Sequence, residues 1–351
     1  SSLTWEKVTT LDLGLDARFF DGAFGATFDW FQRVTSDMHT AGETLPSTFG
    51  ASSPQINFGE LTATGWELAL DYNHKFSNGL GLNLRASLAH VEEEITKWND
   101  QANKISGNYE GRKLGEIWGY VTEGIFQSEE EVKNHASQAL YESGSFKFGV
   151  GDVKYKDLNG DGTITYGSNT VDDPGDQKII GNSMPNYEYS FTIGLDYKGF
   201  DFSTYFQGVG SRDYWAYGNV AIPSGMSALD AIFTHQTDYW TPQNTNAFYP
   251  RPTDHNWVSD GQNFKIQDRY LSDMSYLRCK NITLGYSLPK NLLKKIDFQK
   301  VRVYFSAENM FTWDNMHLPV DPETTSWKGA WAFGRSYPYM KTISFGVQAV
   351  F

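Results

Sequence analysis

In the C-terminal stretch of the chain, residues 341–351, every second residue from Ile343 to Phe351 is apolar, and Thr342, Ser344, Gly346 and Gln348 alternate with them. Successive side chains of a β-strand point to opposite faces, so this period of two predicts a strand with one apolar face. The stretch is about ten residues long, which is enough to cross a bilayer as a tilted strand. Its apolar positions are Ile343, Phe345, Val347, Ala349 and Phe351. The pattern therefore predicts a membrane-crossing β-strand at the end of the chain.

The same alternation recurs upstream. Further stripes lie at residues 11–19, 24–30, 66–72, 80–88, 187–197, 200–206, 273–288 and 301–307. Within residues 273–288 the apolar parity slips between Cys279 and Ile282, and a β-bulge near Asn281 would cause such a slip. The pattern thus predicts nine strands in all.

The connections between these strands alternate in length. The turns near residues 20–23, 75–80 and 198–200 are tight, and the connection at 288–300 is moderate. Long connections lie near residues 36–58, 91–185, 212–272 and 314–337. Short turns at one end and long loops at the other are typical of outer-membrane barrels, whose long loops face the cell exterior. We therefore expect an all-β fold, a transmembrane antiparallel β-barrel.

Composition is compatible with this fold class. Aromatic residues make up 16% of the chain and charged residues 20%, and no apolar run is long enough for a transmembrane helix. In a barrel only every second strand residue has to be apolar. A soluble β-sandwich, such as a carbohydrate-binding protein, is the alternative, but such a protein rarely ends on an apolar stripe without a polar tail.

Charge and cysteine content exclude two classes of site. The formal net charge is -13, and no basic stretch is present that could bind nucleic acid. Cys279 is the only cysteine, so neither an internal disulfide framework nor a Cys-rich zinc site can form.

The strand count suggests a larger barrel. If the last strand runs from the outside to the periplasm, the first of nine strands runs the same way, and the chain would begin outside the cell. Single-chain bacterial barrels have an even number of strands with both termini in the periplasm. The first residues, SSLTW, do not form a signal peptide, so we expect a processed chain or a fragment.

Several segments together resemble one family, the SusC/RagA class of TonB-dependent outer-membrane transporters. The most specific match is GDVKYKDLNGDG at residues 151–162, followed by IIGN at 179–182. Other matches are LTWEK at 3–7, NFGE at 57–60, TGWE at 64–67, GYVT at 119–122, GIFQ at 124–127, YFQG at 205–208 and the closing segment 337–351. The resemblance spans nearly the whole chain.

The resemblance implies a 22-strand barrel with an N-terminal plug domain, of which residues 1–351 would be the C-terminal part. On this resemblance, we expect the plug domain and the first strands to lie outside residues 1–351. The resemblance also implies the outer membrane of a Gram-negative bacterium and a SusD-like surface lipoprotein that caps the barrel. A TonB complex would act through the missing plug, and the remaining strands and outer-membrane lipid would surround the wall.

Residues 157–164, DLNGDGTI, predict a calcium-binding loop. Asp157, Asn159 and Asp161 occupy positions 1, 3 and 5 of an EF-hand-type loop, and Gly162 stands at the sixth position, where such loops turn sharply. The backbone carbonyl of Thr163 would be the seventh-position ligand. Clustered hard oxygen atoms of this kind suit Ca²⁺ in a structural role.

The acidic residue that would complete the calcium ligands does not stand at the usual twelfth position of the loop. The twelfth position is Ser168, which cannot supply a bidentate carboxylate. Relatives with a similar loop carry an acid before the IIG motif, and this resemblance implies Asp176 as the closing ligand. The alternative is that Asn159-Gly160 and Asp161-Gly162 only form turns.

Aromatic residues in the long loops are candidates for contacting cargo. Aromatic faces in a wet cavity suit sugar rings or peptide side chains, and an acidic vestibule disfavours anionic cargo. The candidates are Trp215, Tyr217, Trp240 and Trp257. The alternative is that each packs within its loop or joins the aromatic girdle at the membrane surface.

No catalytic motif is found in the sequence. The seven histidines are scattered, and neither an H-E-x-x-H nor a G-x-S-x-G motif occurs. We therefore expect no enzyme, but a protein that actively imports an oligosaccharide or peptide nutrient with energy from TonB. A passive porin, or a structural barrel with adhesive loops, is the alternative, and a plug domain encoded upstream would decide for the importer.

Overall fold

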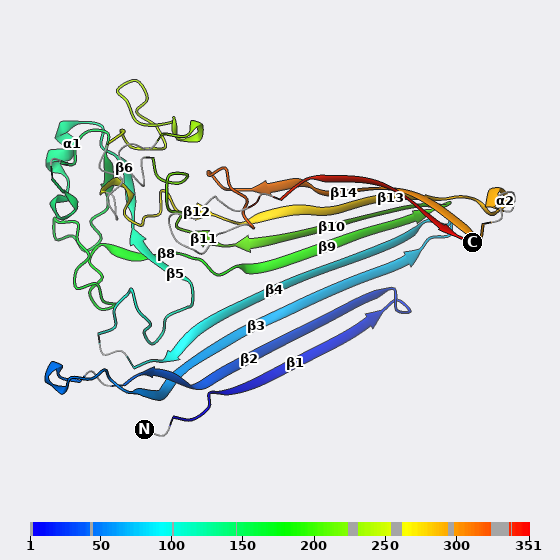
Figure 1. Cartoon of the computed structure of the whole chain (residues 1–351), viewed down its shortest axis with the longest axis horizontal. Helices are drawn as coiled ribbons and strands as arrows, with labels where there is room; N and C mark the ends of the chain where they lie inside the picture. The colour runs from blue at the N-terminus through cyan, green and yellow to red at the C-terminus, as the bar shows by residue number, and fades with distance from the viewer. Residues whose placement is uncertain are drawn as a thin grey trace.

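The main feature of the structure, a computed structural model, is one antiparallel sheet of nine strands (Figure 1). The structure describes residues 3–42, 45–99, 102–144, 146–223, 231–253, 262–293, 298–323, 337 and 339–351. In sheet order the strands are β1 (Lys7–Phe19), β2 (Phe24–Ala41), β3 (Gln55–Lys75), β4 (Gly81–Lys97), β9 (Asn186–Tyr197), β10 (Phe200–Ser211), β13 (Tyr276–Ser287), β14 (Lys300–Asp314) and β15 (Thr342–Val350). The predicted nine-stranded antiparallel wall is confirmed.

Tight turns join the strands at one end of this sheet. Between β9 and β10, Lys198 and Gly199 have φ angles of 47° and 90°. Two successive positive φ angles are what a two-residue type I′ hairpin requires, and glycine adopts them without a steric cost. The longer connection between β13 and β14 contains the short helix α2 (Lys290–Leu293).

Several strands extend further than the hydrophobic pattern indicated. Strand β2 runs to Ala41 and β4 to Lys97, so the loops predicted near 36–58 and 91–185 begin at 42 and 98. In β4, Glu92, Glu93 and Glu94 break the apolar alternation. Their backbone nevertheless pairs with β3, for example Glu93 with Ala63. Backbone pairing continues beyond the point where one face has to be apolar, and the periodicity cannot report that extension.

One face of the sheet is apolar across all nine strands. The ladder registers align Leu15, Phe28, Leu68, Leu88 and Tyr189 in one row on β1, β2, β3, β4 and β9. On β14 and β15, Phe305 and Val303 stand opposite Phe345 and Val347. Phe345 is 81% exposed, so this face has no protein layer over it. An exposed apolar face of this extent fits contact with lipid rather than water.

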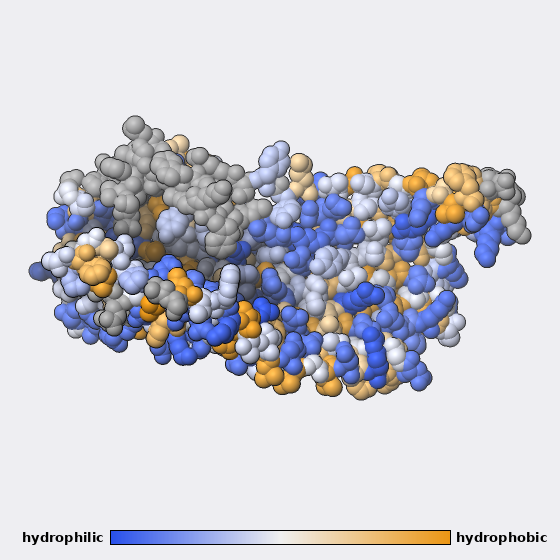
Figure 2. All heavy atoms as spheres, turned by 60° about the horizontal axis from the view of Figure 1, so that its bottom comes forward, coloured by the Kyte–Doolittle hydropathy of each residue, from blue (hydrophilic) through white to orange (hydrophobic). Residues whose placement is uncertain are grey.

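The opposite face of the sheet is polar, and we call it the inner wall. Two of its ion pairs reach across an intervening glycine. Arg18 on β1 lies 2.7 Å from Asp71 on β3 across Gly25, and Arg302 on β14 bonds Asp201 on β10 across Gly285. Figure 2 shows hydrophilic residues over most of the visible side of the sheet, with hydrophobic residues along its lower edge.

The predicted irregularity near Asn281 is present. The register of β13 with β14 shifts between Cys279 and Asn281, and that of β10 with β13 shifts at Tyr205 and Phe206. This bulge keeps Cys279 and Ile282 on the apolar face although their spacing is odd.

The sheet is open at both sides. Among the described residues, β1 pairs only with β2, and β15 pairs only with β14. A membrane-spanning sheet cannot leave such edges unpaired. The wall therefore needs further strands on both sides, in agreement with the expectation that nine strands form part of a larger barrel.

The long connections fold together at the other end of the sheet, where the described parts of residues 98–185 and 212–275 form a unit that we call the crown (Figure 1). Its strands and helices are β5 (Glu116–Tyr120), β6 (Thr122–Ile125), α1 (Glu129–Asn134), β7 (Val153–Tyr155), β8 (Gln177–Asn182), β11 (Asp213–Tyr214) and β12 (Ser272–Asp273). Short 3-10 turns lie at Ala139–Tyr141, Thr234–Gln236 and Gln262–Phe264, with another at Ser47–Phe49 in the β2–β3 loop. No described helix is long and apolar enough to cross a membrane.

Candidate functional site

The crown has a hydrophobic core of its own. Tyr155 and Val153 of β7 are fully buried, as is Ile164. The other buried members are Tyr120, Tyr141, Phe146, Phe148, Trp215, Tyr249, Phe264 and Tyr270. The Tyr155 hydroxyl donates to the Gln262 carbonyl at 2.8 Å, so its polar tip is satisfied although burial raises its pKa well above the usual value. Both long connections thus contribute to one packed unit.

A fully buried carboxylate joins the two connections. Asp152 receives hydrogen bonds from the Arg251 guanidinium at 2.7 and 2.9 Å and from the Asn263 amide at 2.9 Å. The Gly149 backbone N–H also donates to it at 2.9 Å. Asn263 in turn accepts from the Val153 backbone N–H at 2.8 Å. A buried charge is tolerated only with such partners, so this cluster fixes the two chain segments relative to each other.

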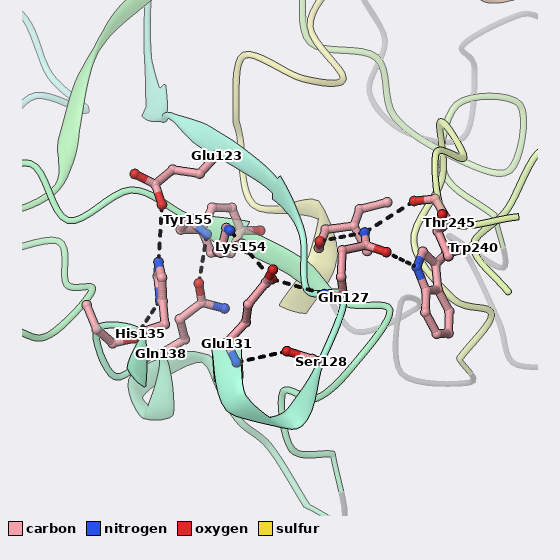
Figure 3. Close-up of polar contacts among 12 residues, drawn as sticks. Glu123, Gln127, Ser128, Glu131, His135, Gln138, Lys154, Tyr155, Trp240 and Thr245 are labelled. Atoms are coloured by element: carbon pink, nitrogen blue, oxygen red, sulfur yellow. Dashed lines mark hydrogen bonds and ion pairs between the residues drawn. The ribbon is translucent and has the colours of Figure 1, made fainter. Parts of the chain in front are cut away.

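Helix α1 makes a second link between the connections (Figure 3). The Ser128 hydroxyl accepts from the Glu131 N–H at 3.2 Å, and the Glu131 carboxylate accepts from the Gln127 N–H at 3.0 Å. This reciprocal arrangement caps the helix at its start. Glu131 also lies 3.6 Å from Lys154, and Gln127 accepts from the Trp240 indole at 3.1 Å. The indole N–H of Trp240 is therefore used within the crown.

An aromatic hollow of about 360 Å³ opens in the crown. Trp118, Tyr214, Trp215 and Tyr217 supply its rings. The remaining lining residues are Ile105, Ser106, Glu116, Ile117, Asn169, Gln177, Ser183 and Ile266. Aromatic surfaces with a few amide, hydroxyl and carboxylate groups are typical of sites that hold sugar rings or peptide side chains.

The polar edge of the aromatic hollow is preorganised. The Trp118 indole donates to the Tyr109 hydroxyl at 3.0 Å, and that hydroxyl donates to Glu116 at 2.6 Å. Burial raises the pKa of Tyr109 to about 12, so the phenol stays protonated as a donor. The Lys113 N–H also donates to Glu116 at 3.0 Å, which fixes the carboxylate at the rim.

A second, acidic hollow of about 670 Å³ lies beside the first, and Glu116 lines both. It opens where β4 and β9 separate, just beyond their last pair, Ala89 and Glu188. Its charged lining residues are Glu92, Glu93, Lys113, Glu116 and Glu188. Lys113 lies 2.8 Å from Glu92, so the carboxylates outnumber the cation and the hollow disfavours anionic ligands.

The structure brings two of the four predicted cargo residues together. Trp215 and Tyr217 line the aromatic hollow, although Trp215 is only 6% exposed whereas Tyr217 is 41% exposed. Trp240 lies elsewhere, beside Gly151 and Gln127. Trp257 lies outside the described residues. Sequence reasoning missed Trp118, whose place on β5 beside the matched GYVT segment was the available signal, and Tyr214.

The predicted calcium loop has a compact form. Asp157 accepts from the backbone N–H groups of Gly160 and Gly162 at 2.7 and 2.9 Å. Asp161 accepts from the Thr163 N–H and hydroxyl, each at 2.7 Å, and Asn159 accepts from the Asp161 N–H at 2.9 Å. These contacts hold the three oxygen-bearing side chains of residues 157, 159 and 161 on one turn of exposed chain.

Asp176 plays a different part in this loop. It is fully buried, and its two carboxylate oxygens accept from the backbone N–H groups of Leu158 and Thr165, each at 2.7 Å. It thereby ties the beginning of the loop to its end. In the described part of the chain, no three His, Cys, Asp or Glu side chains converge as metal ligands. Calcium binding by this loop therefore remains a prediction.

Comparison with known proteins gives consistent results. Residues 1–121 match the sequence model of the family described as "TonB dependent receptor-like, beta-barrel". TonB-dependent receptor P3 of Formosa agariphila is 28% identical over the whole chain, which covers 34% of that protein. TonB-dependent receptor SusC of Bacteroides thetaiotaomicron is 25% identical over 98% of the chain and 32% of its own length. These relatives are named as receptors, not as enzymes.

The fold also matches a solved structure. The structure titled "Structure of the RagAB peptide transporter" superposes on 99% of the chain with a TM-score of 0.71 at 21% identity, and the match covers 36% of that chain. The chain thus spans about a third of the length of the relatives it matches.

Proposed function

The chain is part of the β-barrel of a SusC/RagA-class TonB-dependent receptor of the Gram-negative outer membrane, and from this premise we propose that the whole protein actively imports an oligosaccharide or peptide. A plug domain elsewhere in the protein would couple import to TonB, and a SusD-like surface lipoprotein would cap the crown. The observation that carries the proposal is the polar inner wall beneath a crown with an aromatic hollow.

The negative charge of the acidic hollow and of the chain restricts which cargo we expect. The carboxylates of the acidic hollow stand beside the aromatic rings, and the chain carries a net charge of -13. A negative potential at the mouth lowers the local concentration of anions. We therefore propose that the cargo is neutral or cationic, and that its rings or apolar groups contact Tyr217 and Trp118.

The test is growth of a strain without the gene on separate panels of neutral oligosaccharides and peptides. We expect growth on one class to be lost and to return with the full-length gene, but not in a strain that lacks TonB. Tyr217→Ala should reduce uptake of that cargo about tenfold, because one stacked ring is worth about 1–2 kcal/mol. Uptake that persists without TonB would instead identify a passive porin.

We further propose that the loop at residues 157–163 binds Ca²⁺ in a structural role. Asp157, Asn159 and Asp161 supply oxygens at alternate positions, and the backbone carbonyl of Thr163 would add another. Support comes from the placement of the three side chains on one exposed turn. Asp176 would shape this loop through its backbone contacts, either alone or while also ligating the ion.

A further inference from the structure

Arg278 is a buried cation on the inner wall of the sheet. It lies on β13, is 1% exposed, and stands opposite Gln207 of β10 and Thr312 of β14. Its Nε donates to the Thr312 hydroxyl at 3.0 Å. The inner wall is expected to face water, so a side chain that is buried there must be covered by another part of the chain.

Residues 315–323, which follow β14 and which we call the strap, provide that cover. Nη2 of Arg278 lies 2.6 Å from Asp321 Oδ2, and Nη1 lies 3.0 Å from Glu323 Oε1. Lys280, two residues along β13, adds a contact of 2.6 Å to the second oxygen of Glu323. Two cations of the wall therefore hold two carboxylates of the strap.

The strap is also fixed on its apolar side. Leu318 is buried and packs with Ala216 and Ala221 of the crown, with Met316 and Val320 at the edge of the cluster. The chain that returns to β15 meets the same point, because the Tyr339 ring lies 4.7 Å from the Arg278 guanidinium and 4.8 Å from the Lys280 ammonium. Both legs of the last long loop thus converge on Arg278.

We infer that Arg278 is a positioning residue that holds the strap across the inner wall and so narrows the passage at this side of the mouth. The inference rests on the proposed import through this barrel. Ion pairs between the wall and the strap hold the strap in one place, whereas loss of the Arg278 cation leaves the carboxylates of Asp321 and Glu323 with fewer partners and releases it. Arg278 would then help to set the size of cargo that can pass.

The test uses the full-length receptor in outer-membrane vesicles, with Cys279→Ala to remove the native thiol and Gln207→Cys as a reporter beside Arg278. The probes are N-ethylmaleimide and a maleimide on a long polyethylene glycol chain. In the parent we expect only the small probe to react at an appreciable rate. Arg278→Met should raise labelling by the large probe about tenfold and increase amide exchange in residues 315–323.

Two further variants separate positioning from general damage. Adding Asp321→Asn to Arg278→Met removes one orphaned charge, so labelling by the large probe should fall back toward the parent rate. Arg302→Met breaks the ion pair between Arg302 of β14 and Asp201 of β10, which lies at the tight-turn end of the sheet, and should leave labelling unchanged. Should Arg278→Met fail to assemble, Arg278→Lys takes its place, with a smaller increase expected.

Labelling by the large probe that is the same in parent and Arg278 variants would overturn the inference. So would equal acceleration by Arg302→Met. Neither result depends on uptake, so each leaves the proposed import standing. Conversely, a strain whose growth never depends on the gene would contradict the import while the labelling result still holds.

Discussion

The sheet and the crown place their apolar side chains in opposite environments. On the sheet, Phe345 and Val347 are 81% and 70% exposed, and order comes from backbone ladders between neighbouring strands. In the crown, Val153, Tyr155 and Ile164 are 0% exposed and pack against one another. The sheet therefore depends on lipid as its solvent, whereas the crown is stabilised as a water-soluble protein is.

This difference predicts which substitutions destabilise each region. A change in the crown core should loosen the crown and leave the barrel wall intact. A polar residue on the apolar face of the wall should act on membrane insertion and leave the crown packing intact. The following variants test this separation, from the largest expected effect to the smallest.

The largest effect is expected from Asp152→Ala in the crown. It leaves the partly exposed Arg251 guanidinium and the buried Asn263 amide without their shared acceptor, and the lost hydrogen bonds to a charged group together cost about 3–4 kcal/mol. Amide exchange and protease cleavage should increase throughout residues 98–185 and 212–275. The heat-modifiable gel mobility of the folded barrel should not change. Asp152→Asn is the control, since it keeps an acceptor in place and should lose less.

The next effect concerns the apolar face. Phe191→Arg on β9 would place a charge in the lipid and should cost about 2–4 kcal/mol if the site lies near the bilayer midplane. Thr192→Arg, one residue along, points to the inner wall and should cost much less. Urea titration of refolding into lipid vesicles measures both. Equal losses for the two variants would mean that the two faces do not differ in solvent.

A smaller effect is expected where an ion pair crosses a glycine. A Cβ atom at position 285 would come within 2.4 Å of the Arg302 guanidinium, so Gly285→Ala should displace its contact with Asp201. Overpacking of this kind costs about 1–2 kcal/mol. Gly194→Ala on the same wall is the matched control, because its nearest neighbour would be an Asn83 side-chain atom at 3.4 Å. Thermal stability of the two variants in detergent should differ accordingly.

The smallest effect is expected in the calcium loop. Asp161→Ala should abolish calcium binding in a calorimetric titration and should raise amide exchange only locally, because the crown core does not contain this residue. Unchanged binding would show that the ion, if any, is held elsewhere. No binding by the parent at millimolar calcium would leave only the turns of residues 157–163.

The same loop should respond to acid in a defined direction. Hydrogen bonds from the Thr163 hydroxyl and N–H hold the pKa of Asp161 below its usual value. A carboxyl whose folded-state pKa is lowered stabilises the loop above its unfolded-state pKa of about 4, and the contribution is lost as the pH falls through the lower folded-state pKa. Protection of the loop amides should therefore persist to a pH below about 4. Loss of protection already near pH 5 would contradict these contacts.

The wall was predictable from the sequence because its signal is local and periodic. The alternation of Tyr189, Phe191 and Ile193 with polar neighbours, the turn at Lys198-Gly199 and the parity slip near Asn281 all appear in the structure. Each follows from a period of two or from turn chemistry within a few residues. Strand ends beyond the apolar band, as in β2 and β4, left no such signal.

The crown was not predictable in the same way. Its contacts join residues far apart in the sequence, such as Asp152 and Asn263, and its apolar residues have no regular period. For the same reason the sequence could not show that Trp215 is almost covered while Tyr217 is exposed, or that the buried Asp176 binds two backbone amides. The aromatic and acidic residue types indicated the regions of the hollow and of the calcium loop. Which of these side chains are buried or exposed depends on the packing of the crown.

The central claim is that one face of the nine-stranded wall meets lipid while the other faces an aqueous passage. The most direct measurement places a spin label at each position from 188 to 196 of β9 in the full-length protein and compares collisions with oxygen and with a water-soluble nickel complex. We predict oxygen maxima at 189, 191, 193 and 195, and nickel maxima at the positions between them. Equal accessibility of neighbouring positions to both reagents, or the reverse assignment, would contradict the account.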